Sequence, residues 1–227
     1  MSLTVCFDFG NTRLKYAVFL NQQLQEVNLL PAPSLAAVKA VINVLHPEKT
    51  ILSSVVHHEP EIELFLAANS VFHKLTAHSK LPFTIPVAHP ETVGADRLAM
   101  VAAAVHLFPH HHNLIIGLGS CITFNFVNEE HQFLGGSISP GLEMRFKSMH
   151  DYTALLPLVQ ADWNFPLIGY DTRTNLLSGV IIGMRKEIDG TIEEYALRYD
   201  KFNVLLTGGD MGFFVPHLKS KIFADPQ

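Results

Sequence analysis

A pair of strand-like runs joined by a polar, glycine-containing turn opens the chain and constrains how it can fold. Residues 3–7 and residues 14–19 are rich in β-branched and aromatic side chains, a composition that favours an antiparallel hairpin. The turn at residues 10–12 can direct backbone N–H groups at a bound anion. Lys15 adds a positive charge, and Asp8 can hold a metal-bound water. An ordinary hairpin is the alternative interpretation.

The same order of elements recurs in the second half of the chain. Residues 113–118 and 121–127 are strand-like, and a short turn at residues 119–120 joins them. In the first half, residues 22–29 supply a third expected strand. Alternating helices and strands follow it, including an apolar helical stripe over residues 35–45. The repeat predicts two related α/β domains that face one cleft, with boundaries at residues 1–112 and 113–227.

Composition narrows the class of protein. The chain has 227 residues, of which 48% are hydrophobic and 16% charged, values typical of a soluble globular enzyme. The net charge of -5 argues against non-specific nucleic-acid binding, and we expect no nucleic-acid partner. Two cysteines provide no disulfide framework, and no signal peptide or apolar run long enough to cross a membrane is visible. We therefore expect a cytoplasmic protein without a membrane partner, with the histidine run at residues 110–112 in a solvated loop.

A second segment with chemical potential opens a predicted helix after a proline-rich loop. It reads Gly94, Ala95, Asp96 and Arg97. Its first-turn N–H groups can bind an anion. Asp96 can orient or deprotonate a substrate hydroxyl, and Arg97 can hold a carboxylate with two parallel hydrogen bonds. The alternative is that Asp96 offsets the helix dipole and that Arg97 pairs with Glu91 on the surface.

Taken together, these motifs resemble those of the type III pantothenate kinases, which belong to the superfamily of acetate and sugar kinases, Hsp70 and actin. The matching strings are Asp-x-Gly-Asn-Thr-x-x-Lys at residues 8–15, Gly-Ala-Asp-Arg at residues 94–97, and Gly-Gly-x-Ile-x-Pro-Gly at residues 135–141. The resemblance implies an actin-like ATPase fold, with two ribonuclease-H-like α/β domains around a central cleft. It also implies ATP-dependent phosphorylation of pantothenate to 4'-phosphopantothenate, the first step of coenzyme A biosynthesis.

The resemblance further implies a role for each motif residue. Asp96 is the expected catalytic base, and Gly94, Ala95 and Arg97 are expected to bind pantothenate. Thr172 is expected to contact pantothenate too, often from the neighbouring subunit of a homodimer. The residues expected to bind ATP, together with Mg²⁺, are Asp8, Gly10, Asn11, Thr12, Lys15, Gly119, Ser120, Gly208 and Gly209.

The chain departs from the family pattern in three places. Family members use a monovalent cation, K⁺ or NH₄⁺, but Gly117 stands where they have an aspartate, which predicts a weakened potassium dependence. Val87 replaces a substrate-contacting tyrosine, and family chains usually continue beyond residues 223–226. These departures keep two alternatives open: a non-catalytic regulatory homologue of the same fold, and another small-molecule kinase of the superfamily.

Overall fold

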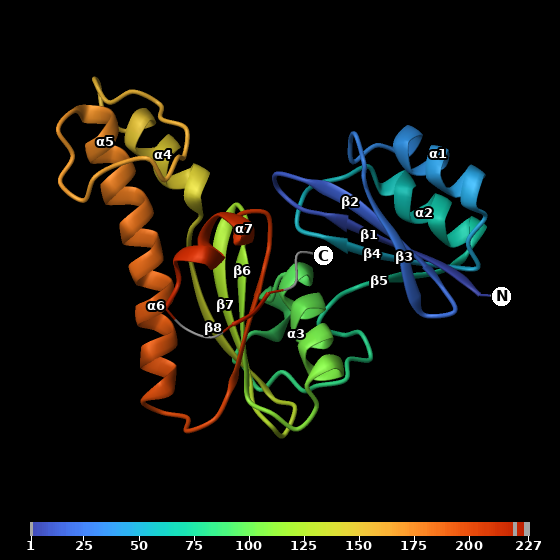
Figure 1. The fold of residues 1–227 in the computed structure, drawn as a ribbon. Helices are drawn as coiled ribbons and strands as arrows, with labels where there is room; N and C mark the ends of the chain where they lie inside the picture. Colours follow the sequence, from blue (N-terminus) through green and yellow to red (C-terminus); the bar gives the residue numbers. More distant parts are fainter. Residues whose placement is uncertain (1, 220–221, 225–227) are drawn as a thin grey trace. The chain divides into compact units, whose positions relative to one another are not determined.

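We describe the protein from a computed structural model, which describes residues 2–219 and 222–224. The chain divides into two compact units, Met1–Ala103 and Ala104–Gln227. Of the stretch at residues 223–226, after which family chains are expected to continue, residues 225 and 226 lie outside the described residues. Each unit contains one five-stranded sheet (Figure 1).

The sheet of the first unit has the strand order β3-β2-β1-β4-β5. Its first three strands are antiparallel, whereas β4 and β5 run parallel to β1. The strands are β1 (Leu3–Phe9), β2 (Leu14–Leu20), β3 (Gln23–Leu29), β4 (Lys49–Ser54) and β5 (Val71–Lys74).

Helices α1 (Leu35–Leu45) and α2 (Pro60–Asn69) pack together and cover one face of this sheet (Figure 1). Alternate residues of β1, Val5, Phe7 and Phe9, are buried beneath them, as the period of two along a strand requires. Asp8 projects from the opposite face of β1, and that face carries the chemistry described below.

The second unit repeats this topology. Its sheet has the order β10-β9-β6-β7-β8, which is the order of the first sheet read from the other end. Its strands are β6 (Asn113–Leu118), β7 (Cys121–Val127), β8 (Phe133–Pro140), β9 (Asn203–Thr207) and β10 (Phe223–Ala224). β6, β7 and β8 are antiparallel neighbours, and β9 runs parallel to β6. The duplicated ribonuclease-H-like topology confirms the expected fold class.

A long helical segment covers the sheet of the second unit (Figure 1). It consists of α5 (Thr172–Leu177), a π-helical stretch (Ser178–Ile182) and α6 (Gly183–Ala196). Leu177, Ile181, Met184 and Ile188 bury one side of it against the strands. The remaining helices are α3 (Ala95–Leu107), α4 (Leu142–Asp151), α7 (Met211–Phe214) and short 3₁₀ turns at Pro90–Thr92 and Val215–His217.

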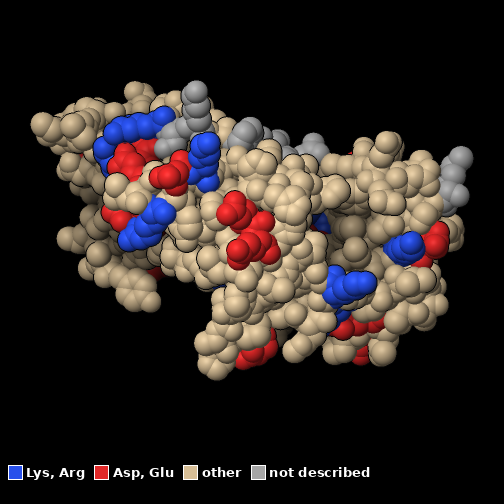
Figure 2. Space-filling view, turned by 90° about the horizontal axis from the view of Figure 1, so that it is seen from below, with Lys and Arg blue, Asp and Glu red and all other residues tan. Residues whose placement is uncertain are grey.

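The boundary between the two compact units falls inside α3, between Ala103 and Ala104. The domain boundary that the sequence predicts, between residues 112 and 113, lies after this helix and stays a prediction. The histidine run lies after α3, where the ring of His110 stacks on that of His131 at 5.0 Å between centroids. Acidic and basic side chains are interspersed on the face shown in Figure 2. None of the helices in the described part of the chain has both the length and the apolar character needed to span a bilayer.

Candidate active site

Asp8 lies near the end of β1 with polar groups on both neighbouring strands. In the antiparallel pair with β2 it faces Lys15, and in the parallel pair with β4 it faces Ser53. Residues directly opposite one another in a sheet project from the same face. The Oγ atom of Ser53, which is buried, donates a hydrogen bond of 3.3 Å to Oδ1 of Asp8. The carboxylate is therefore held from one side and has a cation on the other.

The environment of Asp8 raises the pKa of its carboxyl group. Desolvation is the main cause, and repulsion from Asp96 acts in the same direction, while the Ser53 hydrogen bond and Lys15 oppose both. Water still reaches the side chain, so the desolvation is partial. The start of α3 lies near the end of β4, since Cγ1 of Val55 is 3.7 Å from the place where a Cβ atom on Gly94 would stand, and the repulsion between the two carboxylates agrees with this.

The turn after β1 is tight. A Cβ atom on Gly10 would lie 2.9 Å from the carbonyl oxygen of Arg13, so a side chain at this position would push the turn open. Asn11 and Thr12 are exposed at its tip. All five residues expected to bind ATP in this unit thus lie within one hairpin, with Asp8 and Lys15 paired at the base of its turn.

Asp96 lies in the first turn of α3, in close contact with the residues around it. The backbone N–H of Arg97 donates a 2.8 Å hydrogen bond to Oδ1 of Asp96. A Cβ atom on Gly94 would lie 2.5 Å from the same oxygen. The helix start is therefore shaped around the Asp96 carboxylate, and the N–H of Arg97 is engaged by it rather than left for a ligand. Ala95 is buried beside it.

The side chain of Arg97 is partly buried, and desolvation lowers the pKa of its guanidinium while Asp96 raises it. An arginine remains charged under such a shift. Glu91, the surface partner considered in the sequence, pairs with His89 at 3.2 Å between Oε1 and Nδ1. Asp96, the expected catalytic base, and Arg97, expected to bind pantothenate, are consecutive residues in the first turn of α3.

The second unit brings its own glycine-rich turns together. The β6–β7 turn contains Gly119 and Ser120, and the N–H of Gly141 donates to the carbonyl of Ser120 at 3.0 Å. A Cβ atom on Gly141 would collide with the backbone of both turn residues, so only glycine allows this approach.

The turn after β9 packs on the same end of β6. Gly208 has a φ of 105°, and a Cβ atom there would collide with the backbone of Leu118. The N–H of Asp210 donates to the carbonyl of Leu118 at 3.1 Å, and Gly209 is exposed. The structure thus groups Gly208 and Gly209 with Gly119 and Ser120 within one unit.

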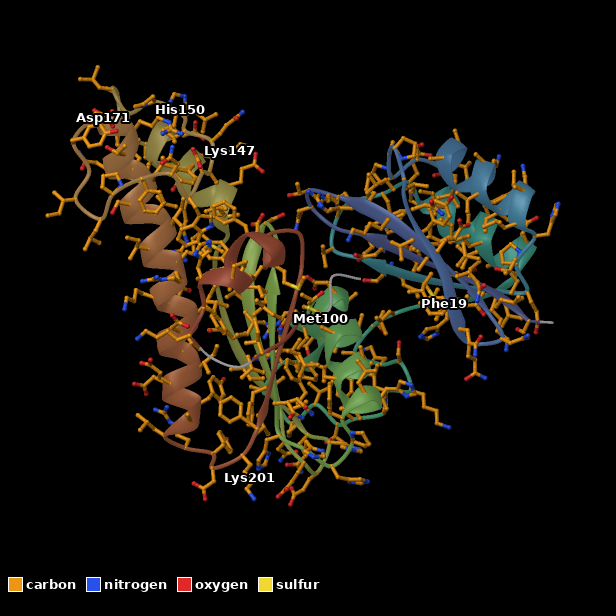
Figure 3. The ribbon with its side chains drawn as sticks, in the orientation of Figure 1. Phe19, Met100, Lys147, His150, Asp171 and Lys201 are labelled. Carbon is orange, nitrogen blue, oxygen red and sulfur yellow. The ribbon has the colours of Figure 1, made fainter. Side chains whose placement is uncertain are left out.

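Thr172 lies on another element, at the first residue of α5. The N-cap is its neighbour Asp171, which Figure 3 shows at the start of this helix and which forms a capping box with Thr174. Asp171 accepts from the backbone N–H of Thr174 at 2.7 Å. Because Asp171 caps the helix, the exposed hydroxyl of Thr172 is not needed for that purpose.

Gly117 lies buried in β6, opposite Thr123 of β7 and Thr207 of β9. It offers no side-chain oxygen to a cation. Within the described residues there is no cluster of three or more histidine, cysteine or acidic side chains that could hold a metal. A metal ion here would rely on isolated carboxylates such as Asp8, backbone carbonyls, water and the substrate itself.

Two contributors were not predicted from the sequence as individual residues. Ser53 could have been found, because the carboxyl ends of parallel neighbouring strands meet at one edge of a sheet and β4 ends in two serines. Gly141 was included only as part of a longer motif, and its contact with the β6–β7 turn depends on tertiary packing.

Comparison with known proteins places these motifs in a family. The family model described as type III pantothenate kinase matches residues 4–194. A type III pantothenate kinase of Christiangramia forsetii is 40% identical over 98% of this chain and 93% of its own length. One of Cytophaga hutchinsonii is 37% identical over 97% of this chain and 92% of its own.

Among solved structures, a conserved protein assigned to the Baf family of transcriptional activators, from Campylobacter jejuni, superposes with a TM-score of 0.61. The two chains are 18% identical, and the alignment covers 97% of this chain and 90% of that one. At this identity the likeness supports the fold alone.

Proposed function

The chain belongs to the type III pantothenate kinase family, and on that basis we propose how its own residues divide the work of phosphorylating pantothenate. The enzyme transfers a phosphoryl group from ATP to pantothenate, which gives 4'-phosphopantothenate on the way to coenzyme A. The observation that carries the assignment of residues is that the end of β4 contacts both motifs of the first unit. Ser53 donates to Asp8 at 3.3 Å, and Cγ1 of Val55 lies 3.7 Å from the place of a Cβ atom on Gly94.

Asp96 acts on the substrate hydroxyl. Its carboxylate accepts the hydroxyl proton as the oxygen attacks the γ-phosphorus, the bond from that phosphorus to the β–γ bridging oxygen breaks, and ADP leaves. The hydrogen bond from the N–H of Arg97 fixes the orientation of the carboxylate. Gly94 leaves room for it, and Ala95 fills the space beneath the turn.

Arg97 binds the carboxylate of pantothenate. Its guanidinium is partly desolvated, and a bidentate pair with a carboxylate would offset that cost. The hydroxyl of Thr172 adds a further contact to pantothenate, from a second subunit. Its exposure at the start of α5 and the independent capping by Asp171 support this role.

The nucleotide is bound by small residues and one lysine. Gly10, Asn11 and Thr12 offer backbone and side-chain donors to the phosphates, and Lys15 supplies a positive charge. In the second unit, Gly119 and Ser120 contact phosphate, while Gly208 and Gly209 admit the flat adenine base. The close packing of these two turns on β6 supports a shared role.

The kinase uses ATP with a divalent metal ion, and we propose Mg²⁺ with Asp8 as its protein contact, directly or through water. The residues fit, because Asp8 and Ser53 present hard oxygen atoms 3.3 Å apart and a cation would relieve the raised pKa of Asp8. When bound, the ion neutralises phosphate charge. A monovalent-cation site fits less well, since Gly117 lacks the carboxylate that family members offer, and we propose a weakened potassium dependence.

We propose that the protein is a homodimer and that it works in the cytoplasm. Large apolar and aromatic side chains between α4 and α5 are mostly exposed, as expected of a surface that a second subunit covers: Tyr152, Leu155, Leu167, Ile168 and Tyr170. Cys6 and Cys121 are both free thiols, in keeping with a reducing compartment.

A coupled assay of ADP formation, run with and without pantothenate, tests the function. We expect ADP formation to depend on pantothenate and the product to carry the mass of 4'-phosphopantothenate. Pantothenate-independent hydrolysis, or turnover with sugars alone, would overturn the assignment in favour of another kinase. Nucleotide binding without turnover of any acceptor would favour the regulatory alternative.

A further inference from the structure

A chain of four polar side chains starts at the end of β4 in the first unit. Nδ1 of His58 lies 3.1 Å from Oγ of Ser54, and Nε2 of His58 lies 3.0 Å from Oε1 of Glu63. The same Glu63 oxygen accepts from Nζ of Lys74 at 2.6 Å. The side chain of His58 is only 9% exposed, whereas Glu63 and Lys74 are partly exposed, so the chain runs from an enclosed ring to the surface.

The partners of His58 leave its ring little freedom. Oγ of Ser54 donates its own proton to the carbonyl of Val56 at 3.0 Å, so its lone pairs face the ring. Nδ1 also lies 3.3 Å from that carbonyl, which can only accept. Glu63 is held ionised: burial raises the pKa of its carboxyl, but hydrogen bonds from Lys74 and His58 outweigh this and lower it. The ring is therefore bordered by oxygen atoms of Ser54, Val56 and Glu63, each of which can accept a hydrogen bond.

Residues 53–56, which His58 contacts, lie against both the Asp8 strand and the turn that carries Asp96. Ser53 donates to Asp8, and the N–H of Val55 donates to the carbonyl of Phe9 at 3.0 Å. Cγ1 of Val55 lies 3.7 Å from the place where a Cβ atom on Gly94 would stand. The ring of Phe9 meets the ring of His58 edge-on, with 5.7 Å between centroids.

We propose that His58, held by Glu63, is a positioning residue that fixes residues 53–56 and through them the spacing of Asp8 and Asp96. The inference rests on the proposed roles of those two aspartates. His58 touches neither carboxylate, so its effect is on alignment: it keeps Ser53 against Asp8 on one side and Val55 against Gly94 on the other. Misalignment of about 1 Å can cost about 10²-fold in rate without loss of binding.

His58→Leu tests the proposal, because leucine fills similar space and removes both hydrogen bonds. The matched control is His73→Leu. His73 also bonds a serine, with 2.8 Å from Nε2 to Oγ of Ser79, but it lies on β5, where it pairs with Ile51 of β4 rather than with residues 53–56. We expect His58→Leu to lower kcat by at least about tenfold, with KM for ATP and pantothenate changed by less than about threefold, and the control to leave kcat unchanged.

Rescue adds a second criterion. His58→Asn keeps a donor near Ser54 and Val56, whereas His58→Gln keeps a donor near Glu63 only. We expect the asparagine variant to recover more of kcat than the glutamine variant, since the contact with residues 54–56 is the one that positions the site. A kcat for His58→Leu within about twofold of the parent, or a loss that matches the control, overturns the proposal.

Backbone hydrogen exchange at Val55 separates this inference from the function itself. We expect the Val55 N–H, bonded to Phe9, to exchange at least about tenfold faster in His58→Leu, while amides of the β1 core keep their protection. This readout needs no catalysis. Unchanged exchange at Val55 in His58→Leu overturns the positioning role. Faster exchange in His58→Leu, combined with a parent that does not turn over pantothenate, upholds the positioning and overturns only the function.

Discussion

Gly94 and Asp96 are so close that a Cβ atom on the first would lie 2.5 Å from Oδ1 of the second. The obstacle is the end of a side chain, so Gly94→Ala should displace the carboxylate rather than unfold the helix. We predict that this variant lowers kcat by about 10²-fold, as small misplacements of a catalytic group do, with little change in melting temperature.

Gly190→Ala is the matched control for that substitution. Gly190 lies inside α6, and a Cβ atom there would meet nothing within 4 Å. It should leave turnover unchanged and slightly raise thermal stability, as alanine does within a helix. Equal activity of the parent and Gly94→Ala in steady-state kinetics would show that the orientation of Asp96 does not depend on Gly94.

The raised pKa of Asp8 predicts that nucleotide binding is linked to protons. A metal contact needs the ionised carboxylate, so Mg²⁺·ATP affinity should weaken as the pH falls through this raised pKa, and binding at mildly acidic pH should release protons. The number of protons released can be measured by calorimetric titration of the protein with Mg²⁺·ATP in buffers of different ionisation enthalpy. Asp8→Asn should abolish the release, and an unchanged release would assign it to another group.

The same shift has a consequence for folding. A carboxyl group whose pKa is higher in the folded than in the unfolded chain contributes its stability below the unfolded pKa, and this is lost as the pH rises through the folded value. Asp8→Asn should therefore raise the melting temperature more at about pH 8 than at about pH 4. A decrease of similar size at both values would contradict the desolvation of Asp8.

Local patterns predicted much of the fold, because the spacing of apolar residues along a segment distinguishes helices from strands. The helix expected over residues 35–45 is α1, and the repeated hairpin turns of the two halves were placed correctly. The two-residue β10 is too short to carry a period, and no local signal marks the π-helical stretch at Ser178–Ile182. The contact of Ser53 with Asp8 and the fit of Gly94 around Asp96 depend on how the chain folds locally and packs. The residue pattern of a single segment does not predict them.

Gly117 predicts a weak response to potassium. Titrating K⁺ against a sodium background on the parent and on Gly117→Asp separates the possibilities. We expect little activation of the parent, and both potassium activation and tighter ATP binding in the aspartate variant, because a bound cation adds positive charge near the phosphates. Steep activation of the parent, equal to that of the variant, would show that backbone carbonyls and water suffice.

The exposed apolar surface between α4 and α5 predicts a dimer. Light scattering at micromolar concentration should give twice the chain mass. Ile168→Glu, which places a charge on this surface, should shift the protein toward monomer, whereas Val44→Glu on the exposed side of α1 should not. If the parent protein is monomeric and fully active, the proposal that Thr172 contacts pantothenate from a second subunit is wrong.

Asp96→Asn tests the role of Asp96 in phosphoryl transfer most directly. The asparagine keeps the shape of the side chain but cannot take the hydroxyl proton, so pantothenate-dependent ADP formation should fall by about 10²–10⁴-fold. ATP affinity, measured by calorimetry, should stay within about threefold of the parent, since the loss is confined to the hydroxyl. Turnover within a few-fold of the parent would contradict the assignment of Asp96 as the group that acts on pantothenate.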